Sequence, residues 1–223
     1  MKQLIAIFTL SLCVTFAFAQ SDSGKKYGTL IKNVQGNIYM LETPNGNLAL
    51  QIGYQGIFAA GNLASDYLEN ALDDIAQVTE EPIRLMVNTQ FDAQRTSANG
   101  LAAENGAIIM AQENAHARMQ NTIRTRQKLF DQSAFPHVKF KDDLVLNYNG
   151  EKIMLYPIKS GYSDCDVVVH FEDSNVLMVG NLFENKKYPE IAAITPVKLS
   201  KNKINKHFLL LFRDKTFVFN LFN

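Results

Sequence analysis

Side chains that could bind a metal or act as a nucleophile are few in this chain of 223 residues. Imidazole ligands could come only from four histidines, which are His116, His137, His170 and His207. No two of them lie at the short spacing by which a helix or a hairpin brings metal ligands together. We therefore expect each histidine to lie at the surface or to make a single hydrogen bond.

A second chemical group is the run Ser163-Asp164-Cys165-Asp166. A serine or cysteine nucleophile needs a general base within reach, and no histidine lies close to this run in the sequence. The two carboxylates would have to activate the nucleophile alone. The run is therefore a weak candidate for metal-free catalysis.

Composition excludes several classes of protein. The 22 basic and 22 acidic side chains balance, whereas a general nucleic-acid binder needs a basic surface. An apolar fraction of 47% is typical of a packed globular chain. Two cysteines are too few for a disulfide-rich scaffold or a cysteine-only zinc site.

Residues 1–19 have the pattern of a secretory signal peptide. Lys2 precedes an apolar run, and Ala17-Phe18-Ala19 forms a small-x-small cleavage site before Gln20. A membrane anchor and a lipoprotein modified at Cys13 are the alternatives, but the run is short for a span and Leu12 is large for a lipoprotein site. Cleavage would leave 204 residues, one cysteine and a net charge of −1. We expect an exported protein, periplasmic or secreted, with no transmembrane span.

The elements that must position these side chains alternate between strands and helices. After a polar lead-in and a first strand over residues 20–35, Asn-Gly and Gly-x-x-Gly turns predict hairpins. Apolar residues at helical spacing after Ser65, the expected N-cap, predict a helix that ends before Pro82. Further strands are expected at 37–43, 48–52, 57–60, 83–87, 107–111, 138–140, 144–148, 152–156, 166–171 and 176–179, and further helices at 99–103 and 112–130. This order predicts one α/β domain.

Residues 192–223 differ in composition from the rest of the chain. They contain six basic residues, a single acidic residue and five of the fifteen phenylalanines. Apolar runs on both sides of Arg213-Asp214-Lys215 predict a hairpin over 207–223. This tail either completes a sheet or forms an apolar surface for contact with a protein or a membrane.

Several landmarks follow a fixed order between Gly36 and Ile191. They are Gly36 to Leu41, Gly46 to Ala49, Gly56 to Ala60, Pro82 to Thr89, Gly106 to Asn114, Phe135 to Phe140, Gly161 to Asp166 and Val179 to Phe183. In order and spacing they resemble the metallo-β-lactamase superfamily of zinc hydrolases. The resemblance implies a domain over 36–191 with a metallo-β-lactamase-like αββα sandwich, two mixed sheets flanked by helices. The divergent tail would leave its second half incomplete.

The resemblance also implies that the zinc ligands are replaced. The family motif Thr-His-x-His-x-Asp-His matches residues 89–95, where the histidine positions hold Gln90, Asp92 and Arg95 and the aspartate position holds Gln94. The other ligand positions that can be placed hold Gly61, Tyr162 and Asn181, and the last histidine has no counterpart. Amides are poor zinc ligands, and Arg95 adds a permanent cation. We therefore expect no zinc and no other cofactor.

Three interpretations of the former active site remain. Arg95, with amides and a tyrosine around it, could bind a small anion. Ser163 or Cys165 could act as a metal-free nucleophile. Alternatively, Arg95 could pair with Asp92 or Asp164 and fill the site of a fold that has lost its enzymatic role. The retained positions, which are Thr89, Thr96, Asn99, Asp164 and Asp166 with Ser163 as a near match, indicate fold more than activity.

The sequence therefore predicts an exported, non-catalytic relative of zinc hydrolases that binds a small anionic molecule in its former active site. The alternative is a hydrolase of the ester, thioester or β-lactam type with weak, altered-metal or metal-free activity. No catalytic or metal-binding residue is assigned. The candidate pocket residues are Gln90, Asp92, Gln94, Arg95, Tyr162, Ser163, Asp164, Asp166 and Asn181.

Overall fold

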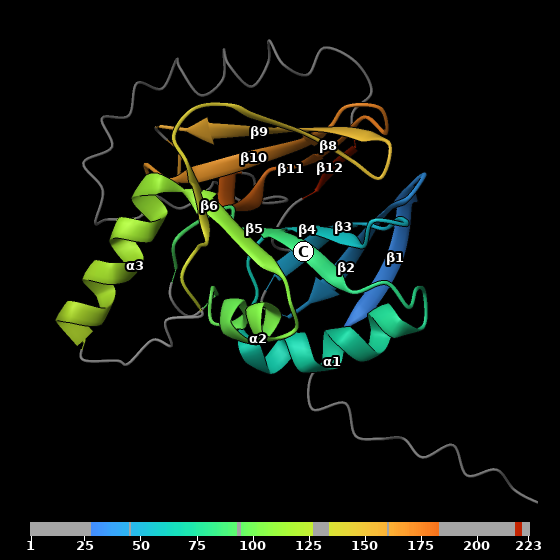
Figure 1. The fold of residues 1–223 in the computed structure, drawn as a ribbon, viewed down its shortest axis with the longest axis horizontal. Coiled ribbons are helices and arrows are strands. Elements are labelled where there is room, and N and C mark those ends of the chain that lie inside the picture. The colour runs from blue at the N-terminus through green and yellow to red at the C-terminus, as the bar shows by residue number, and fades with distance from the viewer. Residues whose placement is uncertain are drawn as a thin grey trace, which may run out of the picture.

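Two β-sheets face each other in the computed structural model, which describes residues 28–44, 46–92, 95–126, 134–159, 161–182 and 217–219. Figure 1 shows the sheets as two layers, with helices α1 and α2 beneath the first sheet. The expected signal peptide at 1–19 and the candidate residue Gln94 lie outside the described residues.

The first sheet contains seven strands in the order of the sequence. They are β1 (Leu30–Gln35), β2 (Ile38–Thr43), β3 (Gly46–Gln51), β4 (Ile57–Ala60), β5 (Ile83–Val87), β6 (Ile108–Gln112) and β7 (Val138–Phe140). Strands β1 to β4 pair antiparallel as hairpins, and β4 to β7 pair parallel. Since parallel strands run in one direction, the segments that follow β4, β5, β6 and β7 leave from the same edge of the sheet. We call this edge the site edge.

The second sheet has the order β12-β11-β10-β9-β8. Its strands are β8 (Leu144–Tyr148), β9 (Glu151–Ile158), β10 (Asp166–Phe171), β11 (Val176–Met178) and β12 (Phe217–Phe219). All pairs are antiparallel except β11 with β12. Strand β12 belongs to the divergent tail, so part of the tail extends this sheet. The other arm of the predicted tail hairpin lies outside the described residues.

The main core lies between the two sheets. Ile38, Phe58 and Val87 of the first sheet and Leu155 and Phe171 of the second are each fully buried there. The rings of Phe58 and Phe171 meet edge to face at 5.9 Å, which ties the layers together.

Helices cover the other face of the first sheet. Helix α1 (Ser65–Ala76) and helix α2 (Ala98–Glu104) bury their apolar sides in a second core with strands β3 to β6. Helix α3 (Glu113–Arg126) lies beside β6 and β7, at one side of the molecule (Figure 1). None of the helices in the described ranges has the length and apolar character needed to cross a bilayer.

Side-chain amides join the two sheets at the edge opposite the site edge. The Asn149 side chain accepts a hydrogen bond from the Gln55 backbone N–H at 2.8 Å and donates to Gln51 Oε1 at 3.0 Å and to the Gly56 carbonyl at 2.8 Å. Gln51 in turn donates to the Tyr148 carbonyl at 2.9 Å. We call this group the amide latch, because it fastens the β3–β4 turn to the β8–β9 turn.

The predicted α/β sandwich of two mixed sheets with flanking helices is confirmed, but one helix start was wrong. The N-cap of α1 is Ala64, which makes no side-chain cap bond, and Ser65 is already helical. The reason is tertiary, because the Ser97 hydroxyl accepts a hydrogen bond from the Ser65 backbone N–H at 2.9 Å. A neighbouring segment thus satisfies an N–H group that a local cap would otherwise satisfy.

Candidate functional site

The segment between β5 and α2, where the resemblance places the zinc motif, is held by Asn62. The Asn62 Oδ1 atom accepts hydrogen bonds from the backbone N–H of Thr89 at 2.8 Å, the Thr89 hydroxyl at 3.0 Å and the backbone N–H of Gln90 at 3.1 Å. Its Nδ2 atom donates to the Gln90 carbonyl at 3.1 Å. Asn62 is fully buried, and its side chain fixes the backbone at the start of this segment.

Sequence reasoning missed Asn62 and assigned only the neighbouring position 61. Gly61 has a φ of +132°, a backbone conformation that L side chains rarely adopt. A Cβ atom there would lie 3.0 Å from the Asn47 carbonyl oxygen and 3.1 Å from Met178 Cε. The local signal was the pair Gly61-Asn62 directly after a strand, since glycine lets the chain turn and asparagine can hydrogen-bond backbone groups.

The rest of the segment is also tied down by polar side chains. Asn88 and Asn99 exchange reciprocal amide hydrogen bonds of 3.0 and 2.8 Å, and Asn99 also donates to the Ala134 carbonyl at 3.0 Å. The backbone N–H and hydroxyl of Thr96 both donate to the Asp92 carbonyl, at 2.9 and 3.0 Å. The retained residues Thr96 and Asn99 thus make hydrogen bonds that hold the segment in shape.

Three predicted pocket residues form one hydrogen-bonded series, which we call the amide relay. Arg95 Nη1 donates to Asn181 Oδ1 over a long contact of 3.5 Å. Asn181 Nδ2 donates to Gln90 Oε1 at 2.6 Å. Gln90 is fully buried, and its Nε2 atom has no hydrogen-bond partner among the described residues. The relay connects the β5–α2 segment with the short 3₁₀ helix Gly180–Leu182 after β11.

Asp164 does not join this relay. Its carboxylate forms a two-point ion pair with Arg118 of α3, with distances of 2.7 Å to Nε and 2.8 Å to Nη2. Arg118 also lies over the Phe91 ring, 5.3 Å from its centre. The interpretation in which Asp164 pairs with Arg95 is therefore replaced by a contact that docks α3 on the loop before β10.

Ser163, Cys165 and Asp166 form a buried cluster. Asp166 is 2% exposed, and its carboxylate accepts the Ser163 backbone N–H at 2.6 Å and the Ser163 hydroxyl at 2.8 Å. Burial raises the pKa of the Cys165 thiol to about 12, so the thiolate is scarce at neutral pH. The Ser163 hydroxyl is buried and already donates to Asp166. The cluster therefore does not favour a metal-free nucleophile and instead supports the loop that contains Tyr162.

Asp166 should make the stability of the fold depend on pH. Burial raises the pKa of its carboxyl to about 6, against the hydrogen bonds from Ser163, which lower it. The folded chain therefore takes up a proton at a higher pH than the unfolded chain, and stability rises as the pH falls through 6. Between pH 7.5 and pH 5 the gain should be about 1 kcal/mol in urea unfolding.

The matched variant is Asp166→Asn. Its amide oxygen can accept the Ser163 backbone N–H, and its NH₂ group can donate to the Ser163 hydroxyl, which then acts as an acceptor. This variant should lose the part of the pH dependence that belongs to Asp166. An unchanged difference between pH 7.5 and pH 5 would contradict the assignment.

The residues at the positions where the family resemblance puts the zinc ligands do not fit zinc. Gln90 and Asn181 present amides, and Arg95 presents a cation that would repel a metal ion. In the described ranges, no group of three or more histidine, cysteine, aspartate or glutamate side chains could hold a metal ion. The histidines lie elsewhere: His137 Nδ1 accepts the Ile109 N–H at 3.0 Å, the His116 ring lies 5.4 Å from that of Phe135, and His207 is outside the described residues.

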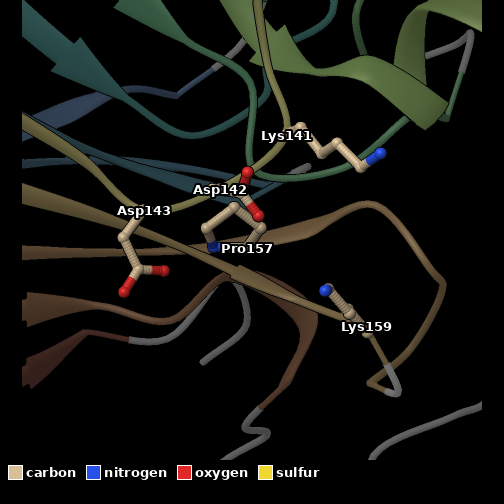
Figure 2. A pocket seen from close by; sticks show the side chains of 5 residues that line it. All are labelled: Lys141, Asp142, Asp143, Pro157 and Lys159. Carbon is tan, nitrogen blue, oxygen red and sulfur yellow. The ribbon is translucent and has the colours of Figure 1, made fainter.

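A shallow pocket of about 300 Å³ also opens at the site edge, but it contains none of the predicted site residues. Figure 2 shows its lining, Lys141, Asp142, Asp143, Pro157 and Lys159. Its four charged side chains are exposed and sum to zero net charge. This arrangement is typical of a solvated surface, and the amide relay is the stronger candidate site.

The whole chain was compared with known proteins. No protein-family model and no curated protein matches it. Solved structures do: a metallo-β-lactamase from Pontibacter korlensis has a TM-score of 0.70 at 13% identity, covering 87% of this chain and 91% of that one. The metallo-β-lactamase IND-7 has a TM-score of 0.69 at 14% identity, with coverages of 86% and 89%. One from Hirschia baltica has a TM-score of 0.65 at 12% identity, with coverages of 87% and 91%.

These likenesses extend over most of both chains, and they agree with the order of strands and helices described above. At such low identity they concern the fold and not the chemistry of the site. The chain therefore has the metallo-β-lactamase fold, with an amide relay at the place where the family resemblance puts the zinc ligands.

Proposed function

We propose that this protein is a non-catalytic relative of the zinc hydrolases, which binds a small anion at the amide relay. The observation behind the proposal is the Nε2 atom of Gln90, a buried hydrogen-bond donor that has no partner in the part of the chain that the structure describes. A buried donor without an acceptor costs about 1–3 kcal/mol. An oxygen atom of a ligand or of a water molecule would remove that cost.

The charges around the relay favour an anionic oxygen. Arg95 is a permanent cation, whereas Gln90 and Asn181 are neutral amides that can supply hydrogen bonds. A guanidinium favours a ligand that brings a negative charge. A carboxylate combines that charge with two oxygen atoms, one for the guanidinium and one for the Gln90 amide.

The same residues argue against a zinc hydrolase. Zinc catalysis needs ligands that leave an open coordination position and lower the pKa of a bound water. Amides and a guanidinium supply neither. The export of the protein is part of the proposal, and it rests on the leader pattern of residues 1–19 alone.

The proposal predicts saturable binding of acetate to the wild-type chain and a loss of that binding in Gln90→Met. Methionine has a similar length but no N–H group, so the affinity for acetate should fall by about tenfold or more. Acetate should be titrated at constant ionic strength, with the side-chain amide signals followed by NMR. Methylammonium serves as the ligand of opposite charge.

Arg95→Ala should weaken acetate binding as well, because it removes the cation. Asn70→Ala is the control, since Asn70 lies on α1 and, among the described residues, its side chain bonds within that helix to the Asp66 carbonyl at 3.3 Å. Wild-type protein that does not respond to acetate, or that binds it equally well in both site variants, would refute the proposal. Stoichiometric zinc with chelator-sensitive ester or β-lactam hydrolysis would refute it too.

A further inference from the structure

The two hydrogen bonds of the amide relay run the same way, from Arg95 to Asn181 and from Asn181 to Gln90, so the orientation of the Asn181 amide determines that of the Gln90 amide. A guanidinium has five N–H donors and no acceptor, so the group that faces Arg95 must be an oxygen. Asn181 accordingly turns Oδ1 toward Arg95, at 3.5 Å, and its Nδ2 toward Gln90, at 2.6 Å. Gln90 must then present Oε1 to Asn181, which leaves Nε2 as the buried atom of Gln90 without a partner among the described residues. Arg95 thus determines, through Asn181, that the second end of the Gln90 amide is a hydrogen-bond donor, Nε2, and not an acceptor.

We infer that Asn181 is a specificity-determining residue, which sets the buried end of the site as a hydrogen-bond donor and so selects ligands that offer an acceptor oxygen. This inference rests on the proposed function and deepens it, because it names the ligand class by hydrogen-bond polarity as well as by charge. Carboxylates fit this class, and amines and other donor-only ligands do not.

Asn181→Asp tests the inference by reversing the polarity without changing the size of the side chain. An ionised aspartate can only accept, so Gln90 would turn its Nε2 toward residue 181, and Oε1 would take the buried place that Nε2 has in the wild type. The affinity for acetate should fall by about tenfold or more, because two oxygen atoms would then face each other. The side-chain amide protons of Gln90 should shift downfield as they bond to a carboxylate.

Gln90→Glu also replaces the hydrogen-bond donor at the buried end of the site by an acceptor, but it changes residue 90 itself. Asn181 could still donate to one carboxylate oxygen of the new residue, and the other oxygen would replace the Nε2 donor. This variant should also lose acetate binding, and it keeps the test available if Asn181→Asp does not fold. Asn147→Asp is the charge control, since Asn147 is exposed on β8 and takes no part in the relay.

The two readouts separate the two proposals. Wild-type chain that does not bind acetate refutes the proposed function, and the Gln90 amide signals of ligand-free Asn181→Asp still test the polarity. An unmoved Gln90 signal in Asn181→Asp overturns the inference. So does a loss of acetate binding without that shift, because charge at residue 181 would then be the whole cause. Acetate binding equal to that of the wild type in both site variants overturns it as well.

Discussion

Replacing Asn62 by leucine should lower the free energy of unfolding by about 3–5 kcal/mol. The side chain accepts three hydrogen bonds from Thr89 and Gln90 and donates one to the Gln90 carbonyl, all in a fully buried place. Leucine has a similar volume but would leave two backbone N–H groups, one hydroxyl and one carbonyl without partners. Urea unfolding followed by circular dichroism measures the loss.

Asn70→Leu is the matched control for this prediction. It makes the same chemical change on α1, where the side chain makes one long bond within the helix, so the loss should stay below about 1 kcal/mol. A similar loss for the two variants would mean that Asn62 does not hold the β5–α2 segment. An amide exchange experiment on Thr89 and Gln90 would locate the effect, because their N–H groups should lose protection only in Asn62→Leu.

The second large effect is expected at the amide latch on the opposite edge. Asn149 has a φ of 51°, which glycine adopts freely, so Asn149→Gly removes the side chain without straining the backbone. The variant loses the bonds to Gln55, Gln51 and Gly56 and should be less stable by about 2–3 kcal/mol. Thermal and urea unfolding of the variant and the wild type give this difference.

Gly53→Ala should break the same latch by another route. A Cβ atom at Gly53 would lie 2.4 Å from Asn149 Cγ and 2.7 Å from its Oδ1, so the asparagine side chain would have to leave its place. Because both variants remove one set of contacts, the double variant should lose clearly less than the sum of the single losses. Additive losses would show that the latch does not act as a unit.

The elements of the fold could be predicted because their patterns are local. Strand β4 (Ile57–Ala60) and strand β5 (Ile83–Val87) were predicted with their observed bounds, since a short apolar run between turn residues leaves little choice. Asn149-Gly150 was predicted as a turn for the same reason, and both residues have positive φ. The α1 cap was wrong because the Ser97 hydroxyl, distant in sequence, replaces a local cap.

The site was harder to predict, because its contacts join distant segments. The resemblance selected Gln90, Arg95 and Asn181, and the structure places them in one hydrogen-bonded series. No pattern indicated that Asp164 pairs with Arg118, which lies 46 positions earlier and on another element. Such a pair depends on how α3 docks, and docking follows from the packing of the whole sandwich. Gln94 lies outside the described residues, so its place in the pocket stays a prediction.

The glycine after β4 has a consequence for whether this fold could hold a metal ion at the site edge. The resemblance puts an aspartate at position 61, where this chain has a φ of +132° and too little room for a Cβ atom. An aspartate introduced there would strain the backbone before it could contribute a ligand. It would also push against the strand that holds Asn47. A metal site of the family type therefore needs more here than an exchange of ligand side chains, because the backbone at position 61 would have to change as well.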